Sequence, residues 1–293
     1  MKHLRYLLGN FLYHKLETRF CQQNGGMNMR ILSIGNSFST DAQYWLKDIA
    51  DAGGVDLEVW NLFIGGCSLE RHMENVVSGE AAYDLLINGK QVSKCSILSA
   101  LKAGKWDYIT LQQASGFSGL WESYENTLVP LSGYVKRNAP EAEIVIHETW
   151  AYEKTSTHPH FEWYGCDQKK MHEALKSCYE RAAEAIGARI IPVGNTVAKL
   201  RETEAFDVEK GGESLSRDGF HLSFVMGRYL AAAVWYVFFT GKDIRENAFV
   251  PARKEMIGYE DGKPIFGDME SDKPCKEKMD ILKEAAFSEV NKA

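Results

Sequence analysis

The sequence contains no long hydrophobic run, no excess of basic residues and no Cys-x-x-Cys pair. Its apolar run at 230–239 is too short to cross a bilayer, and we expect it to be a core helix. With 34 Lys and Arg against 40 Asp and Glu, the formal net charge is -6, which provides no basic footprint for nucleic acid or an anionic membrane. We therefore expect a globular protein with no nucleic-acid partner and no stable membrane insertion.

The six cysteines are scattered through 293 residues, which is typical of free thiols in a reducing compartment. We therefore expect a cytoplasmic protein; a periplasmic or secreted protein is the alternative if the amino terminus is a targeting segment. The spacing of the glycines matches neither Gly-x-Gly-x-x-Gly nor a Walker pattern, which disfavours a nucleotide site. The spacing of the histidines fits no common zinc pattern, so we expect no metal.

Differences in composition divide the chain into three parts. Residues 1–26 begin with basic residues and a short apolar patch but show no convincing cleavage site, so we expect an appendage outside the fold. Residues 27–240 alternate strand and helix patterns and form the main domain. Residues 241–293 are polar, end in a helical pattern at 276–290, and are expected to pack on the same domain.

The main domain alternates β-forming and amphipathic segments. The predicted core strands lie at 29–35, 55–63, 106–112, 143–148 and 188–193. The predicted helices lie at 40–52, 69–77, 97–103, 124–138, 167–186, 195–201 and 223–240. This alternation predicts an α/β fold, a parallel sheet between two layers of helices. An Asn-Gly turn at 88–89 also predicts a hairpin, which we expect to leave the sheet.

Polar or glycine residues follow the ends of four predicted strands. They are Ser37, Gly66, Gln112 and His147. Because ligands of such sheets bind beyond the carboxyl ends of the strands, we expect these residues to surround a site. The segment 218–221 comes just before the last core helix and returns to the same edge.

Ser37 lies between a predicted strand and a predicted helix, where unpaired backbone N–H groups favour developing negative charge. A serine nucleophile needs a base and a group that orients the base. Asp218 and His221, three residues apart on a tight loop, could supply both. The structural alternative is that Ser37, Ser39 or Thr40 only caps the helix and that His221 is partly buried.

Taken together, these residues resemble the SGNH (GDSL-like) hydrolase family. The segment 35–39 matches the family's Gly-Asp-Ser-x-Ser block with Asn in second place, and 218–221 matches its Asp-x-x-His block. The segment 61–66 resembles the second block, a strand that ends in glycine. The resemblance covers about residues 29–240. It implies a flavodoxin-like three-layer α/β/α sandwich with about five parallel strands, a Ser37 nucleophile, and an oxyanion hole that includes the N–H groups of Ser37 and Gly66.

The third block departs from the family pattern. The family usually has Gly-x-Asn-Asp after the third strand, and its Asn completes the oxyanion hole, but 111–116 contains no Asn. A side-chain amide of Gln112 or Gln113 could replace it, and we prefer Gln112 because it lies at the strand end. This pattern resembles a divergent bacterial branch of SGNH proteins with Leu-Gln in this region.

The resemblance implies a serine esterase that needs no metal or organic cofactor. We expect acetyl or other short acyl esters of carbohydrates as substrates, because the aromatic residues of 150–164 could stack on sugar rings; they could equally form the apolar underside of a loop. His147 and Trp150 are expected to line the pocket. A lipase or thioesterase of the same superfamily is one alternative. A non-catalytic carbohydrate- or ligand-binding protein on the same fold is another, motivated by the missing block.

Overall fold

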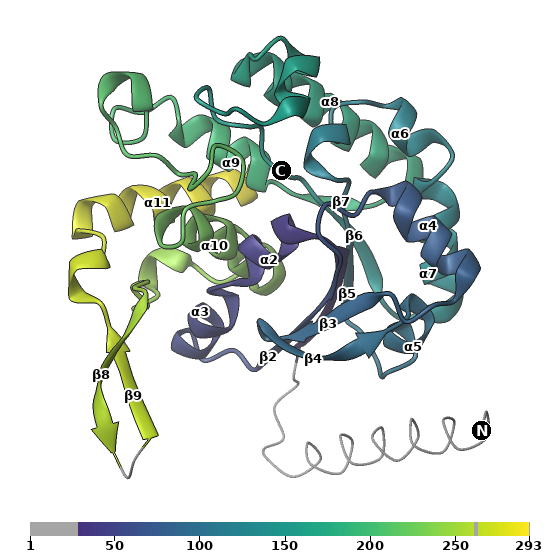
Figure 1. Ribbon diagram of the computed structural model, residues 1–293, viewed down its shortest axis with the longest axis horizontal. Coiled ribbons are helices and arrows are strands. Elements are labelled where there is room, and N and C mark those ends of the chain that lie inside the picture. Colours follow the sequence, from purple (N-terminus) through teal and green to yellow (C-terminus); the bar gives the residue numbers. More distant parts are fainter. Residues whose placement is uncertain (1–28, 261–262, 293) are drawn as a thin grey trace.

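A seven-stranded sheet forms the centre of the computed structural model, which describes residues 29–260 and 263–292 (Figure 1). The strand order is β4-β3-β2-β1-β5-β6-β7. The parallel strands are β1 (Met29–Gly35), β2 (Leu57–Phe63), β5 (Tyr108–Leu111), β6 (Glu143–His147) and β7 (Arg189–Ile191). The predicted α/β fold with five parallel strands is thus confirmed, and the predicted appendage 1–26 lies outside the described residues.

The predicted hairpin consists of β3 (Tyr83–Ile87) and β4 (Lys90–Cys95), and it does not leave the sheet. β3 pairs antiparallel with β2, so the hairpin extends the sheet at one edge. Tyr83 and Leu85 are buried against the core, whereas the residues of β4 are mostly exposed. The prediction of an excursion was wrong because alternate side chains of β3 have an apolar face to bury.

Helices cover both faces of the sheet (Figure 1). One face carries α2 (Ser37–Gln43), α3 (Leu46–Ala52), α9 (Val193–Leu200) and α10 (Met226–Thr240). The other carries α4 (Leu69–Ser78), α5 (Ile97–Leu101), α6 (Glu122–Glu125), α7 (Leu128–Asn138) and α8 (Gln168–Ile186). Two predicted helices are interrupted: 40–52 is divided between α2 and α3, and 124–138 between α6 and α7.

α10 is the helix at the centre of its layer. It contacts α2, α3, α9 and β7, and nearly all of its residues are buried. Its sequence is apolar on every side, as expected for a helix covered all round. Among the described residues, no helix is both long enough and apolar enough to span a membrane.

The carboxyl-terminal region adds a hairpin and a helix. β8 (Lys254–Glu260) and β9 (Lys263–Asp268) form a separate two-stranded sheet that extends from the body (Figure 1) and that the sequence did not predict. α11 (Lys276–Val290) lies where a helix was predicted. It packs on α10 and α9 and buries Met279, Leu282 and Ala286, so it completes this side of the core.

We expect Leu282→Ala to lower the free energy of unfolding by about 2–5 kcal/mol, because it leaves a cavity where a fully buried side chain packs. Leu98→Ala makes the same chemical change at a side chain that is 44% exposed, and we expect it to cost only about 0.5 kcal/mol. Urea denaturation of the two variants and the wild type measures both effects. If the free energy of unfolding fell by an equally small amount in both variants, α11 would add little to the stability of the domain.

Candidate active site

The turn between β1 and α2 positions Ser37. Gly35 ends β1, and a Cβ atom there would lie 2.2 Å from Ser39 Oγ, so the chain can turn this tightly only with glycine. Asn36 caps α2: its Oδ1 accepts the Phe38 N–H at 3.0 Å, and its own N–H donates to Ser39 Oγ at 3.1 Å. The cap is therefore Asn36, and Ser37 at the first helical position keeps its hydroxyl free for other partners.

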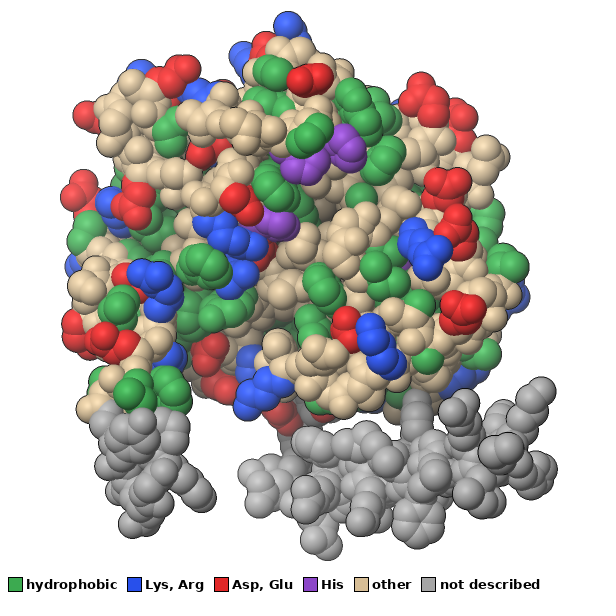
Figure 2. All heavy atoms as spheres, in the orientation of Figure 1, with side chains coloured by type: hydrophobic (Ala, Val, Ile, Leu, Met, Phe, Trp, Pro, Cys, Tyr) green, Lys and Arg blue, Asp and Glu red, His purple; other side chains and the backbone are tan. Residues whose placement is uncertain are grey.

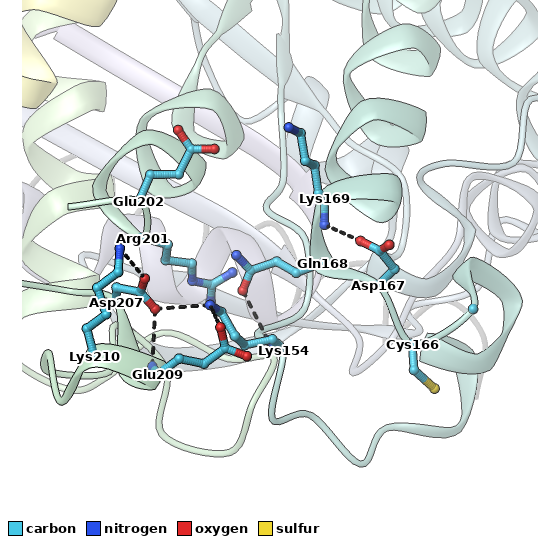
Figure 3. A pocket seen from close by; sticks show the side chains of 11 residues that line it. Lys154, Cys166, Asp167, Gln168, Lys169, Arg201, Glu202, Asp207, Glu209 and Lys210 are labelled. Atoms are coloured by element: carbon cyan, nitrogen blue, oxygen red, sulfur yellow. Dashed lines mark hydrogen bonds and ion pairs between the residues drawn. The ribbon is translucent and has the colours of Figure 1, made fainter. Parts of the chain in front are cut away.

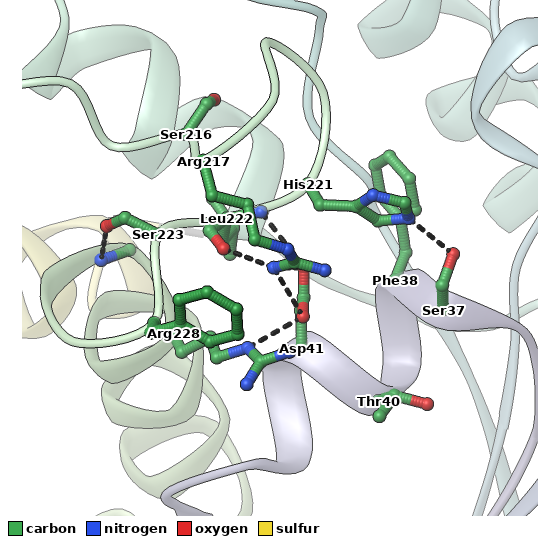
Figure 4. A network of polar contacts seen from close by, with 12 residues as sticks. Ser37, Phe38, Thr40, Asp41, Ser216, Arg217, His221, Leu222, Ser223 and Arg228 are labelled. Atoms are coloured by element: carbon green, nitrogen blue, oxygen red, sulfur yellow. Dashed lines mark hydrogen bonds and ion pairs between the residues drawn. The ribbon is translucent and has the colours of Figure 1, made fainter. Parts of the chain in front are cut away.

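Ser37, His221 and Asp218 form one chain of contacts. His221 Nε2 lies 2.9 Å from Ser37 Oγ (Figure 4), and His221 Nδ1 lies 2.8 Å from Asp218 Oδ2. The structure thus brings together the three residues on which the sequence argument depends. Residues 217–222 form the His221 loop. The left-handed backbone of Gly219, with φ of 83°, lets this loop turn round the Asp218 carboxylate.

The loop also sets the charge of Asp218. Burial disfavours its ionised form, but hydrogen bonds from the His221 side chain and from the N–H groups of His221 and Phe220 outweigh that effect, so the pKa of Asp218 lies below its usual value. An ionised carboxylate accepts the Nδ1 proton of His221 and leaves Nε2 as the acceptor that faces Ser37. This is the arrangement that a general base requires.

A buried carboxylate that the sequence did not predict joins the His221 loop to α2. Asp41 is bonded to Arg217, Arg228 and the backbone of Leu222 (Figure 4). These partners lie 176 to 187 residues from Asp41 in the sequence, so no local pattern pointed to them. The one available signal was an acidic residue one helical turn after Ser37.

Two backbone N–H groups near Ser37 are free to donate. Those of Ser37 and Gly66 have no acceptor among the described residues. Gly66 is exposed and has a φ of 62°, in the turn after β2. Asn36 Nδ2 donates to the Cys67 carbonyl at 3.0 Å, which holds this turn against the turn that bears Ser37.

The two glutamines at the end of β5 differ in their partners. Gln113 Oε1 accepts the N–H groups of Leu69 and Ala114, and its Nε2 donates to the hydroxyl and carbonyl of Ser123. Gln112 Nε2 donates to Asn36 Oδ1 at 2.8 Å, which leaves its second amide hydrogen without an acceptor among the described residues. The contacts therefore favour Gln112 over Gln113 as a donor to a ligand.

His147 and Trp150 were predicted to line the pocket, and both are fully buried instead. Burial lowers the pKa of His147 to about 3, so the ring is neutral, and its Nδ1 lies 2.7 Å from Gln112 Oε1. Trp150 stacks on Phe38 at 4.3 Å and donates its indole N–H to the Phe220 carbonyl at 2.7 Å. His147 Nδ1 contacts Gln112 and the Trp150 N–H bonds to the residue before His221, so both residues pack behind the site instead of lining it.

The aromatic segment after β6 is partly core and partly surface. Several of its rings are buried, which fits the prediction of an apolar underside: Trp150, Tyr152, Phe161 and Tyr164. A chain of ring contacts also leads outward from His221 through Phe220, His158 and His160 to Trp163, which is 49% exposed. Histidine and hydrophobic side chains line a hollow in this face (Figure 2). No group of three or more His, Cys, Asp or Glu placed to hold a metal ion occurs in the described part of the chain.

A polar pocket of about 530 Å³ lies apart from these residues, near the start of α8 (Figure 3). None of its lining residues belongs to the Ser–His–Asp chain. Several of its charged side chains are already paired with one another: Lys154 Nζ lies 3.0 Å from Asp207 and 2.8 Å from Glu209. We therefore take the Ser–His–Asp chain, and not this pocket, as the candidate active site.

Glu148 is a buried carboxyl group beside His147, at the end of β6. Its Oε2 accepts the Asn195 N–H at 2.9 Å, but burial outweighs this bond and raises its pKa to about 8. The folded protein therefore keeps a proton on Glu148 at neutral pH.

The free energy of unfolding should fall as the pH rises from about 5 to 8, because the unfolded chain releases the Glu148 proton near pH 4.5 and the folded protein holds it to about pH 8. The expected slope is about 1 kcal/mol per pH unit. Glu148→Gln keeps an acceptor for the Asn195 N–H and removes the titrating group. Its free energy of unfolding should therefore depend less on pH, and it should exceed that of the wild type by the most at pH 8. Urea denaturation at four pH values tests this, and equal slopes for the two proteins would contradict it.

Comparison with known proteins places the chain among SGNH-like folds. The model of the DUF4886 family, described as a domain of unknown function, matches residues 30–257. The crystal structure of a DUF4886 protein from Bacteroides uniformis is 31% identical, with a TM-score of 0.77 over 90% of this chain and 95% of that chain. A candidate SGNH hydrolase from Slackia heliotrinireducens is 25% identical, with a TM-score of 0.51 over 71% of this chain and 97% of that chain.

No curated protein sequence matches the chain significantly. The structural likenesses support the predicted relationship to the SGNH hydrolases. The assignment to a divergent bacterial branch stays a prediction.

Proposed function

The chain belongs to the DUF4886 family, and we propose that it is a serine esterase that hydrolyses acyl esters through Ser37, His221 and Asp218. The observation that carries this proposal is the unbroken contact chain from Ser37 Oγ through the His221 ring to the Asp218 carboxylate, at 2.9 and 2.8 Å. A serine that only capped the helix would have no need of a histidine held by an ionised aspartate.

In the proposed reaction, His221 Nε2 takes the Ser37 proton as Oγ attacks the ester carbonyl. The resulting oxyanion is held by the N–H groups of Ser37 and Gly66 and by the free amide hydrogen of Gln112. His221 then protonates the leaving alcohol. Water next attacks the acyl group on Ser37 while His221 takes a proton from it, and His221 gives that proton to Ser37 Oγ as the acid leaves. Asp218 keeps the ring in one tautomer and stabilises the imidazolium that forms.

For the substrate we propose acetyl or other short acyl esters of carbohydrates. The support is the chain of rings that leads from His221 to the half-exposed Trp163, because flat aromatic surfaces pack well on the C–H faces of sugar rings. Trp163 lies stacked on His160 at 3.9 Å, so its outer face is held in a fixed orientation.

Ser37→Ala should abolish hydrolysis of p-nitrophenyl acetate, with kcat falling by about 10⁴-fold or more, because no other hydroxyl among the described residues hydrogen-bonds to the His221 ring. Ser132→Ala is the matched control, since within the described part of the chain that hydroxyl bonds only to the Val129 carbonyl of α7. Equal activity of wild type and Ser37→Ala on a panel of acetylated sugars would contradict the esterase proposal. Retained sugar binding by both proteins would then favour a non-catalytic binding protein.

Gln112→Ala should lower kcat by about 10²-fold or more, because removal of one oxyanion donor typically has an effect of this size. Gln113→Ala provides the comparison. Because the Gln113 side chain bonds to other parts of the protein, this variant should have a lower free energy of unfolding but an unchanged kcat per folded molecule. Steady-state kinetics and denaturation of both variants separate the two roles. The opposite pattern would assign the oxyanion donor to Gln113.

A further inference from the structure

Asp41 is a buried carboxylate on the helix that carries Ser37. It is 1% exposed and lies four residues after Ser37, about one helical turn away. Its oxygens accept hydrogen bonds from Arg217 Nη1 at 3.0 and 3.1 Å and from Arg228 Nε at 2.8 Å. A carboxylate that is buried and bonded by two guanidinium groups has a fixed position.

The contacts of Asp41 reach the residue that follows His221. Leu222 donates its N–H to Asp41 Oδ2 at 2.9 Å, and its carbonyl accepts from Arg217 Nη1. The N–H of Arg217 in turn donates to the His221 carbonyl at 3.0 Å. The backbone on the carboxyl side of His221 is therefore held to α2 directly through the Leu222 N–H and, through Arg217, by the Leu222 carbonyl (Figure 4).

The other bonds of His221 do not set its distance from Ser37. The Asp218 carboxylate orients the ring, but Asp218 and His221 belong to the same loop, so their contact moves with the loop. A further link to the α2–α3 region, from the Trp45 indole to the Phe224 carbonyl at 3.0 Å, lies three residues further along the chain. Among the described residues, Asp41 makes the direct hydrogen bond between α2, the helix of the nucleophile, and the backbone beside the base.

We propose that Asp41 is a positioning residue, which holds the His221 loop on α2 at the distance that proton transfer from Ser37 requires. The proposal rests on the proposed esterase function. Asp41 bonds to Arg217, Leu222 and Arg228 and acts on the reaction only through His221. A small displacement of the base is enough to slow proton transfer strongly.

Two variants test the proposal. Asp41→Asn weakens the hold on the loop but leaves two guanidinium groups without a carboxylate, and this can impair folding. The double variant Asp41→Asn/Arg217→Met removes one negative and one positive charge, so the group keeps its net charge. Glu58→Gln is the matched control, because it breaks a part-buried carboxylate–guanidinium contact, to Arg30 Nε at 2.9 Å, that has no link to Ser37.

The measurement is kcat for p-nitrophenyl acetate per active site, with active sites counted by a fluorophosphonate probe that reacts with the nucleophilic serine. We expect kcat per site to fall by about 10- to 100-fold in both Asp41 variants, with KM within about threefold of wild type. The rate of reaction with the probe should fall in parallel, since it uses the same proton transfer. Glu58→Gln should keep the wild-type kcat per site even if fewer molecules are folded.

A kcat per site within twofold of wild type in the folded Asp41 variants would overturn the positioning role and leave the esterase proposal standing. Such a result would mean that Asp41 affects only the fraction of folded protein. A wild-type protein that neither hydrolyses the ester nor reacts with the probe would instead overturn the proposed function, and with it this inference. The two failures are therefore distinguishable in one set of assays.

Discussion

The hydrogen bonds of the buried Asn36 side chain hold three segments of the site together. Its Oδ1 accepts from the Phe38 N–H and from Gln112 Nε2, and its Nδ2 donates to the Cys67 carbonyl. A carboxamide can accept and donate at once, whereas an ionised carboxylate in the same place would only accept and would repel the Cys67 carbonyl oxygen. Asn in the second place of the Gly-Asp-Ser-x-Ser pattern therefore fits a site in which the turn after β2 is held through a carbonyl.

The sheet and the helices fix the two halves of the site independently. Ser37 is set by the end of β1 and the start of α2, whereas His221 comes from a loop that leads into α10. α10 packs against α2, so the two halves share one rigid interface. Trp150 adds a second connection below the site, because it stacks on Phe38 and bonds to the Phe220 carbonyl. Residues next to Ser37 and His221 are thus held from the interior.

The resemblance to the SGNH hydrolases predicted that Ser37, Asp218 and His221 lie together, and local patterns in the sequence predicted most of the elements. They failed where the outcome depends on a partner from elsewhere. The hairpin of β3 and β4 joins the sheet because β2 offers a free edge, which no local pattern reveals. His147 was expected to line the pocket because it lies at a strand end, and that position did not reveal that it would be buried and bonded to Gln112. The sequence favoured Gln112 over Gln113 only by its place at the predicted strand end, and the hydrogen-bond partners of the two side chains were needed to separate them.

The His221 loop divides its polar contacts between two directions. Asp218 directs its carboxylate inward to the imidazole and to two backbone N–H groups of the same loop, whereas Arg217 directs its guanidinium outward to Asp41. In the proposed reaction, the positive charge that develops on His221 meets a carboxylate already in place, and the loop need not move to provide it. Because Arg217 and Leu222 are bonded to α2, the interaction of His221 with Asp218 can strengthen without drawing the ring away from Ser37. The separation of an orienting carboxylate from an anchoring one lets a short, partly exposed loop present a base with fixed geometry.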